Sequence, residues 1–163
     1  MVTRKALLVD AMLGSLARKL RIFGFDTVYD KDSDDSTLLV SARLENRTLV
    51  TCDKELHKIA IRGKIQSILL NREREEDKMV EVARRLRFPV GNLKPEDSRC
   101  PLCNGILRSV SSPNAPKSVP QRIRHQHPTF YVCKRCEKAY WEGSHWKKLT
   151  TLSAYVEGRS INF

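Results

Sequence analysis

Short apolar runs alternate with longer amphipathic stretches along the first ninety residues. The runs have the length of buried strands, and in the longer stretches apolar side chains recur every three or four residues, as on one face of a helix. Strands are predicted at residues 5–10, 26–30, 47–51 and 64–71, and helices at 12–24, 36–46, 54–63 and 73–88. This alternation predicts an α/β fold in which helices flank a mostly parallel sheet.

The ends of the predicted elements carry turn and cap residues. Gly24 follows the first predicted helix, Pro89 closes the fourth, and an acidic loop at 30–35 offers Asp or Ser caps to the second. The alternation stops at 91–99, which resembles a linker. We therefore expect a first domain at 1–92 and a smaller one at 93–163.

The second part contains two Cys-x-x-Cys pairs. Cys100 and Cys103 form the first pair and Cys133 and Cys136 the second, with 29 residues between the pairs. Cytosolic disulfides are rare, whereas two facing pairs of thiolates give the tetrahedral shell that Zn²⁺ prefers. Since four thiolates complete that shell, we predict a structural zinc ion in a zinc ribbon. Three nearby histidines are not needed as ligands: His125, His127 and His145.

Positive charge is concentrated in the second part. The chain holds 30 Lys and Arg against 19 Asp and Glu, a net charge of +11. Residues 1–98 hold 19 basic and 16 acidic side chains, and 99–163 hold 11 and 3, so the second part carries +8 of that charge. A surplus of this kind is typical of proteins that bind polyanions, with nucleic acid as the first candidate, although it also serves solubility.

Aromatic side chains lie among these basic residues, a mixture suited to phosphate contacts and base stacking. Some of them, such as Phe130 and Tyr140, are expected to form a small core beside the zinc instead. The candidate nucleic-acid contacts of the second part are Arg122, Arg124, Lys134, Arg135, Trp141, His145, Trp146, Lys147 and Lys148. Those of the first part are Arg18, Lys54 and Arg72.

Acidic residues follow two of the predicted strands. Asp10 ends the first, Asp53 follows the third, and Asp35 begins the helix between them. Since functional groups gather at the carboxyl ends of parallel strands, these carboxylates are expected to meet at one sheet edge. There they repel one another unless Mg²⁺ or Mn²⁺ neutralises them, and such an ion can activate water for attack on phosphorus.

Other roles are open for these acids. Asp35 and Asp53 can each cap the helix that follows. A phosphoacceptor receiver domain also carries acids after its first and third strands, but it needs a second acid beside the first, where Ala11 stands.

Cys52 attracts attention as a thiol beside a carboxylate. Because side chains alternate along a strand, Cys52 is expected to point away from Thr51 and Asp53, into the packing, as a small hydrophobe. His57 lies on the following helix, and we do not expect it to form a nucleophilic pair with Cys52.

Three segments are distinctive: LLVDAMLGSLARKLRIFGFDTVYD at 7–30, DDSTLLVSARLENRTLVTCDKEL at 34–56, and the two cysteine pairs with AYWEGSHW at 139–146. Together they resemble the Mut-seven C-terminal RNase family, PIN-like nucleases fused to a zinc ribbon. The resemblance implies a metal-dependent ribonuclease. It implies that Asp10, Asp35 and Asp53 bind the metal and that Thr51 is the small hydroxyl residue two positions before the third acid. PIN-like sites commonly add a fourth acid after the next strand, where this chain has Asn71 and then Arg72.

The leading hypothesis is therefore an endoribonuclease that uses Mg²⁺ or Mn²⁺, with a zinc ribbon that helps to bind RNA. The alternative is a non-catalytic RNA-binding or adaptor protein with a vestigial site. DNA remains open as a substrate, because nothing in the sequence recognises a 2′-hydroxyl.

No apolar run is long enough for a membrane span and no signal peptide is visible, so we expect a cytoplasmic protein. Protein partners and oligomeric state are left open.

Overall fold

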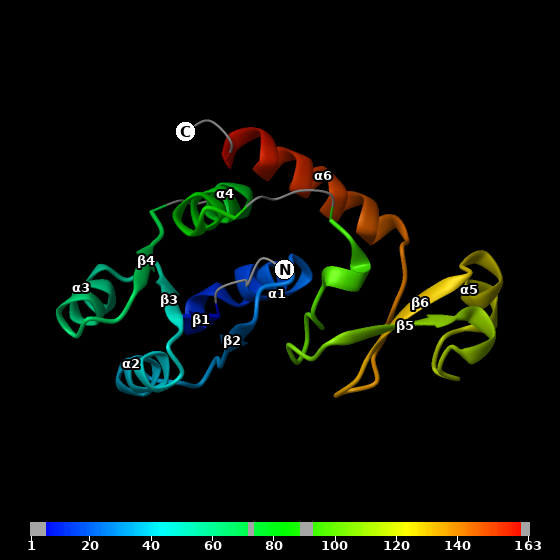
Figure 1. Ribbon diagram of the computed structural model, residues 1–163, viewed down its shortest axis with the longest axis horizontal. Helices are drawn as coiled ribbons and strands as arrows, with labels where there is room; N and C mark the ends of the chain where they lie inside the picture. Colours follow the sequence, from blue (N-terminus) through cyan, green and yellow to red (C-terminus); the bar gives the residue numbers. More distant parts are fainter. Residues whose placement is uncertain (1–5, 72–73, 89–92, 161–163) are drawn as a thin grey trace.

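Four parallel strands form the centre of the first part. The computed structural model describes residues 6–71, 74–88 and 93–160 (Figure 1). Its strands are β1 (Leu7–Val9), β2 (Thr27–Tyr29), β3 (Thr48–Thr51) and β4 (Ser67–Leu69), in the order β2-β1-β3-β4. The predicted α/β fold with a parallel sheet is confirmed, and β1 and β3 are neighbours.

Helices cover both faces of this sheet. One face carries α1 (Gly14–Ile22) and α4 (Glu75–Leu86), and the other carries α2 (Asp35–Leu44) and α3 (Lys54–Arg62). Alternation along β1 explains the two layers, because Leu7 and Val9 pack with α1 and α4 whereas Leu8 packs with α2 and α3. Both faces are buried, as expected for a parallel sheet.

The predicted helices agree with the structure to within a few residues. Gly24 has a φ of 85°, a conformation that favours glycine, and it ends the first helical segment as predicted. The first helix begins with a 3₁₀ turn, η1 (Ala11–Leu13), that leads from β1 into α1. Pro89 lies outside the described residues, and α4 ends with Arg87 in the left-handed conformation.

The second part is a small antiparallel ribbon. A short 3₁₀ turn, η2 (Pro95–Asp97), leads into β5 (Leu107–Ser111), β6 (Thr129–Cys133) and β7 (Ala139–Tyr140), which pair in that order. A 3₁₀ turn, η3 (Ser112–Asn114), and α5 (Gln121–Gln126) lie between β5 and β6. Phe130 is fully buried in the ribbon's own core, as predicted.

A long C-terminal helix, α6 (Ser144–Ser160), was not predicted. It leaves the ribbon and returns to the first part, where it runs beside α4 (Figure 1). Val156 is fully buried in the same core cluster as β1 and α1, and the Tyr155 hydroxyl donates to Asp77 at 2.9 Å. The predicted boundary at residue 92 lies outside the described residues, and the two parts share a core through α6.

The buried side chain of Arg21 also joins the two parts. Its Nε donates to the carbonyl of Thr27 at 2.9 Å, and its Nη1 donates to the carbonyls of Pro101 and Leu102 at 2.9 and 3.1 Å. The Arg99 N–H donates in turn to the Arg21 carbonyl at 2.8 Å. The first cysteine turn is therefore fastened to the end of α1. In the described part of the chain, none of the helices has the length and apolar content needed to cross a bilayer.

Candidate functional site

Asp10 and Thr51 meet at the carboxyl edge of the sheet, where β1 and β3 end side by side. The Asp10 N–H donates to the Val50 carbonyl at 3.0 Å, and the Thr51 hydroxyl donates to Oδ2 of Asp10 at 2.7 Å. The same hydroxyl accepts the Asp53 N–H at 2.9 Å. Adjacent strands and their register therefore connect Asp10, Thr51 and Asp53 through one hydroxyl group.

The Asp10 carboxylate is nearly buried yet has no cationic partner among the described residues. Only 6% of the residue is exposed, and no described Lys or Arg nitrogen lies within 4.0 Å of its oxygens. Apart from Thr51, its described hydrogen-bond partner is the Met12 N–H, at 3.4 Å from Oδ1. Since a buried charge is costly unless it is paired, the position suits a bound cation.

Asp53 is the cap of α3. Its Oδ1 accepts the N–H groups of Glu55 and Leu56 at 2.7 and 3.0 Å, so its capping role is confirmed. Its other oxygen, Oδ2, has no hydrogen-bond partner among the described residues, and Asp53 is exposed. One oxygen of Asp53 thus fixes the helix while the other faces solvent near the strand ends.

Asp35 lies at the first position of α2 and is exposed. The cap of α2 is Asp34, whose Oδ1 accepts the Thr37 N–H at 2.8 Å, so Asp35 is free of that task. The described carboxylates do not form a group of three with all ligand oxygens within 4.8 Å of one another. Carboxylate oxygens are the ligands that Mg²⁺ and Mn²⁺ prefer, and binding of an ion by Asp10, Asp35 and Asp53 stays a prediction.

The end of β4 lacks an acid, as the sequence indicated. Asn71 is exposed two residues beyond β4, and Arg72 lies outside the described residues. The acid that sequence analysis missed near this edge is Glu75, in the first turn of α4. Burial opposes its ionisation, but Lys19, at 2.8 Å, outweighs it and lowers the pKa of Glu75. Glu75 is therefore already paired.

Cys52 packs against the core cluster on the α1 and α4 side, as predicted. Burial raises the pKa of its thiol, and the Asp10 and Glu75 carboxylates add to this while Lys78 opposes it. A protonated thiol is a poor nucleophile. The Nδ1 of His57 is 2.9 Å from the Ser67 hydroxyl, so His57 is engaged elsewhere.

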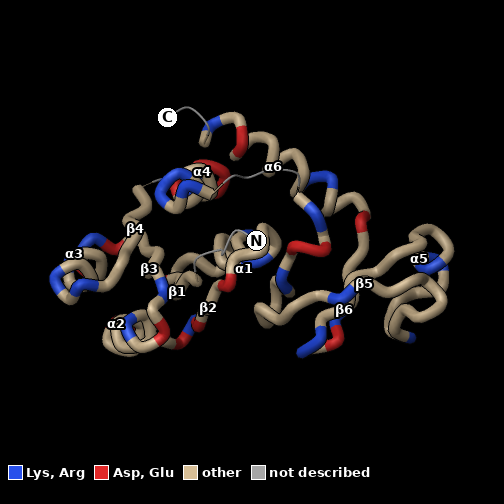
Figure 2. The backbone as a smooth tube through the Cα atoms, in the orientation of Figure 1, with Lys and Arg blue, Asp and Glu red and all other residues tan. Residues whose placement is uncertain are grey.

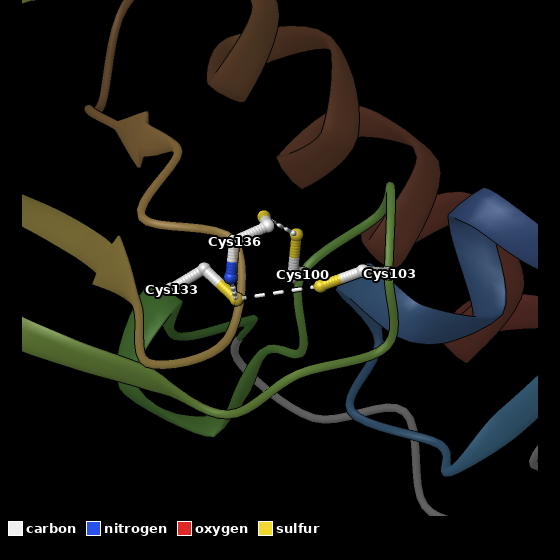
Figure 3. Close-up of side chains that lie close together, drawn as sticks. All are labelled: Cys100, Cys103, Cys133 and Cys136. Carbon is white, nitrogen blue, oxygen red and sulfur yellow. Dashed lines mark hydrogen bonds between the residues drawn. The ribbon is translucent and has the colours of Figure 1, made fainter.

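The four cysteines of the second part converge from two turns (Figure 3). Their sulfur atoms all lie within 4.8 Å of one another, with Cys100 and Cys136 at 3.6 Å and Cys103 and Cys133 at 3.5 Å. Among the described residues, no other cluster of three or more His, Cys, Asp or Glu side chains is compact enough to hold a metal ion. The donor set and its compactness fit a tetrahedral zinc ion.

The thiols of this cluster resist joint ionisation without a cation. Burial opposes ionisation of Cys100, but a hydrogen bond from the Tyr140 hydroxyl, at 3.1 Å, and backbone contacts lower the pKa of Cys100 to about 7. The Lys138 backbone favours the Cys136 thiolate, yet burial and the neighbouring thiols raise the pKa of Cys136 to about 12. A divalent ion removes this conflict, because it binds thiolates.

The predicted nucleic-acid contacts are spread over both parts. Most are exposed, and Figure 2 shows few acidic residues around the ribbon. Two arginines are used within the ribbon: Arg124 donates to the carbonyls of Val119 and Pro116, and Arg135 donates to that of Cys103. The exposed members without such bonds are Arg18, Lys54, Arg122, Lys134, His145, Lys147 and Lys148.

Four of the predicted contacts lie together around one pocket between the two parts. They are Arg18, Trp141, His145 and Trp146. Lys19 and Arg99 line the same pocket and were not predicted, because only the packing of the two parts brings them there.

Similarity to known proteins adds a family assignment to this geometry. No curated protein matches the chain. The family model described as the Mut7-C RNAse domain matches residues 5–153, a range that spans the sheet, the ribbon and most of α6. A nuclease or RNA-related role follows from this match, and the chain belongs to the Mut7-C RNAse domain family.

Proposed function

We propose that this protein is a metal-dependent endoribonuclease that hydrolyses RNA phosphodiester bonds at the edge formed by β1 and β3. The single observation that carries the proposal is the Asp10 carboxylate, which is 6% exposed, oriented by Thr51, and without a described cationic partner. Membership of an RNase domain family supports RNA as the substrate.

Each residue at this edge has a distinct role in the proposal. Asp10 and Asp53 hold the divalent ion, and Asp35 adds a third carboxylate from the start of α2. Thr51 positions Asp10, since it is fully buried and cannot touch RNA. Bound Mg²⁺ or Mn²⁺ supplies Lewis-acid stabilisation of the phosphate charge and lowers the pKa of water. The reaction is hydrolysis by water without a covalent enzyme intermediate, in keeping with the protonated thiol of Cys52.

The zinc ribbon assists RNA binding and does not take part in the chemistry. Four thiolates leave the zinc ion no open position for a substrate, so its contribution is to fold the ribbon. The exposed basic residues of this part supply phosphate contacts, with Arg122, Lys134, Lys147 and Lys148 as the candidates.

The test is cleavage of a labelled single-stranded RNA by the purified full chain in Mn²⁺ or Mg²⁺. Asp10→Asn and Asp53→Asn should each lower the cleavage rate at least about 100-fold, because each removes a charged ligand of the ion. Asp32→Asn is the matched control, since Asp32 is an exposed loop acid, and it should cleave at the parental rate. Cleavage that persists in both site variants would refute the proposal.

A second function is favoured by the end of β4. Asn71 stands where a fourth acid was expected, and Glu75 is paired with Lys19, so this side of the edge lacks a free carboxylate among the described residues. A non-catalytic RNA-binding or adaptor protein would bind RNA tightly and show no turnover in either metal. The same assay with labelled DNA determines whether the 2′-hydroxyl matters.

A further inference from the structure

A pocket of about 420 Å³ lies between the first part and the zinc ribbon. This volume falls in the range of small-ligand sites. The pocket is separate from the strand-end acids, and it is built from α1, the first cysteine turn, the ribbon strands and the start of α6.

One wall of the pocket is a single face of α1. Its side chains are spaced as i, i+3, i+4 and i+7, which places them on one face of the helix: Ser15, Arg18, Lys19 and Ile22. The adjoining Leu16 is fully buried in the core, and of the four pocket residues Ile22 also packs against that core.

The opposite wall is aromatic, and part of it is rigid. The Tyr140 hydroxyl donates to Cys100 in the zinc cluster, and the Trp141 ring packs against Phe130 with centroids 6.1 Å apart. Trp146, in the first turn of α6, differs from them: it is half-buried and takes part in none of the ring pairs found among the described residues. Trp146 thus lines the pocket without an aromatic partner among the described residues.

The charged groups around the pocket are mostly cationic. Arg18 is exposed and forms no ion pair with any described residue, and Arg99 spends one donor, Nη1, on the Asn104 carbonyl at 3.1 Å. Lys19 is neutralised by Glu75. On the ribbon side, the carboxylates of Glu96 and Glu142 both accept the hydroxyl of Tyr131, which lines the pocket, at 3.4 and 3.3 Å. Free positive charge at the rim therefore comes from Arg18, whereas Arg99 is close enough to Asp26 to interact with that carboxylate.

We propose that this pocket binds an unpaired base of single-stranded RNA, which stacks on Trp146 while Arg18 contacts the adjoining phosphate. Flat aromatic surface beside a free guanidinium is the chemistry that recognises a nucleotide, and bases held in a duplex cannot enter such a pocket. The inference rests on the proposed RNA-directed function, but it does not require that the protein cleaves RNA.

The pocket lies along α1 from Asp10, so a base bound there would position the RNA at the strand-end acids. Asp10 leads through a 3₁₀ turn into α1, and the pocket face runs from Ser15 to Ile22, a rise of roughly 10 Å along the helix. An RNA chain anchored in the pocket therefore passes along α1 towards the acids at the ends of β1 and β3. The anchored base selects which phosphodiester bond lies at Asp10.

The test measures RNA binding by fluorescence anisotropy in the full chain carrying Asp10→Asn, so that cleavage cannot interfere. Loss of a stacking ring should weaken binding of single-stranded RNA roughly 5- to 100-fold in Trp146→Ala, whereas Trp146→Phe should retain most of the affinity. Arg18→Ala should weaken binding and reduce the slope of log affinity against log salt by about 0.7. Arg62→Ala is the matched control, since Arg62 is exposed at the end of α3, and it should change nothing.

A second measurement asks for the base itself. One abasic nucleotide is moved through the RNA, and one position should lower affinity in the parent but not in Trp146→Ala. The inference is overturned if the tryptophan variant, with its zinc content and melting temperature intact, binds RNA as tightly as the parent. It is also overturned if no abasic position matters in the parent or in Trp146→Phe. If the protein does not cleave RNA, these binding results are still expected. Failure of the nuclease proposal can therefore be told apart from failure of the base-binding proposal.

Discussion

At the residue scale, Thr51 shows how one buried side chain organises the strand-end edge. Its hydroxyl donates to Asp10 and accepts from the Asp53 backbone, and the residue is fully buried. The sequence predicted that Thr51 and Asp53 face the same way as Asp10, because alternation along a strand determines this. It also indicated that Asp53 can cap the next helix, but it could not show that Oδ1 alone does so while Oδ2 has no described partner.

Thr51→Val should separate the role of this hydroxyl from that of its volume. The substitution nearly preserves volume but leaves Asp10 and the Asp53 N–H without their partner, so we expect a loss of about 1–3 kcal/mol in the free energy of unfolding. Cleavage should fall even where the variant is folded, and Thr51→Ser should restore both. Urea unfolding and cleavage assays check this. Full activity in Thr51→Val would show that the hydroxyl does not position Asp10.

The lowered pKa of Asp26 in the folded protein should make the free energy of unfolding depend on pH. Burial opposes its ionisation, but hydrogen bonds from Arg47 and Asn104, at 3.0 and 2.7 Å, outweigh this and lower the pKa of Asp26. The resulting stabilisation is complete above the unfolded-state pKa, near pH ~4, and is lost as the pH falls through the native pKa. These partners are far apart in sequence, so no local pattern predicts them.

Urea unfolding between pH 3 and pH 6 checks this dependence. Asp26→Asn should cost about 1–2 kcal/mol at pH 6, a value reduced by the partial exposure of the ion pair, and should flatten the fall in stability below pH ~4. Asp32→Asn, in an exposed loop, serves as the control. Parallel pH profiles in the parent and Asp26→Asn would contradict the assignment.

At the scale of elements, the sequence predicted the α/β half well and missed α6. The strands and helices of the first part have clear periods and caps, so local physics determines them. In α6 the apolar side chains Leu149, Leu152 and Val156 do recur at helical spacing, but hydroxyl residues interrupt the face. The partner of this face is α4, in another part of the chain, and the sequence does not reveal that contact.

Val156→Ala tests whether α6 belongs to the core of the first part. Val156 is fully buried there, so its truncation should lower the free energy of unfolding by roughly 1–3 kcal/mol and shift the urea midpoint of the whole chain. Thr150→Ala, at an exposed position of the same helix, should stay within about 0.5 kcal/mol of the parent. A separate, earlier transition for α6 with an unchanged main midpoint would show that the helix does not share this core.

At the scale of the whole molecule, zinc and the sheet should be coupled. The carbonyls of Pro101 and Leu102 in the first cysteine turn accept from Arg21 of α1, so a ribbon that unfolds removes these partners from a buried guanidinium. Zinc removal by a chelator should therefore lower the melting temperature of the entire chain.

Native mass spectrometry and thermal unfolding check the coupling. The parent should carry one zinc ion, Cys103→Ser should lose it, and Cys52→Ala should keep it because Cys52 lies outside the cluster. If the first part melts at the same temperature with and without zinc, the parts are independent. The sequence predicted the four ligands from their spacing, but the position of the ribbon against α1, and hence the pocket, depends on long-range packing.

The bridge made by Arg21 also has a consequence for protein engineering. The guanidinium is fitted to two specific carbonyls of the cysteine turn and to Thr27, and Asn104 completes the join by accepting the Thr27 N–H at 3.0 Å. A zinc ribbon transplanted from an unrelated protein would have to place two carbonyls at these same positions, because otherwise the buried Arg21 guanidinium loses hydrogen-bond partners. We therefore expect a chimaera that exchanges α1 together with the ribbon to be more stable than one that exchanges the ribbon alone.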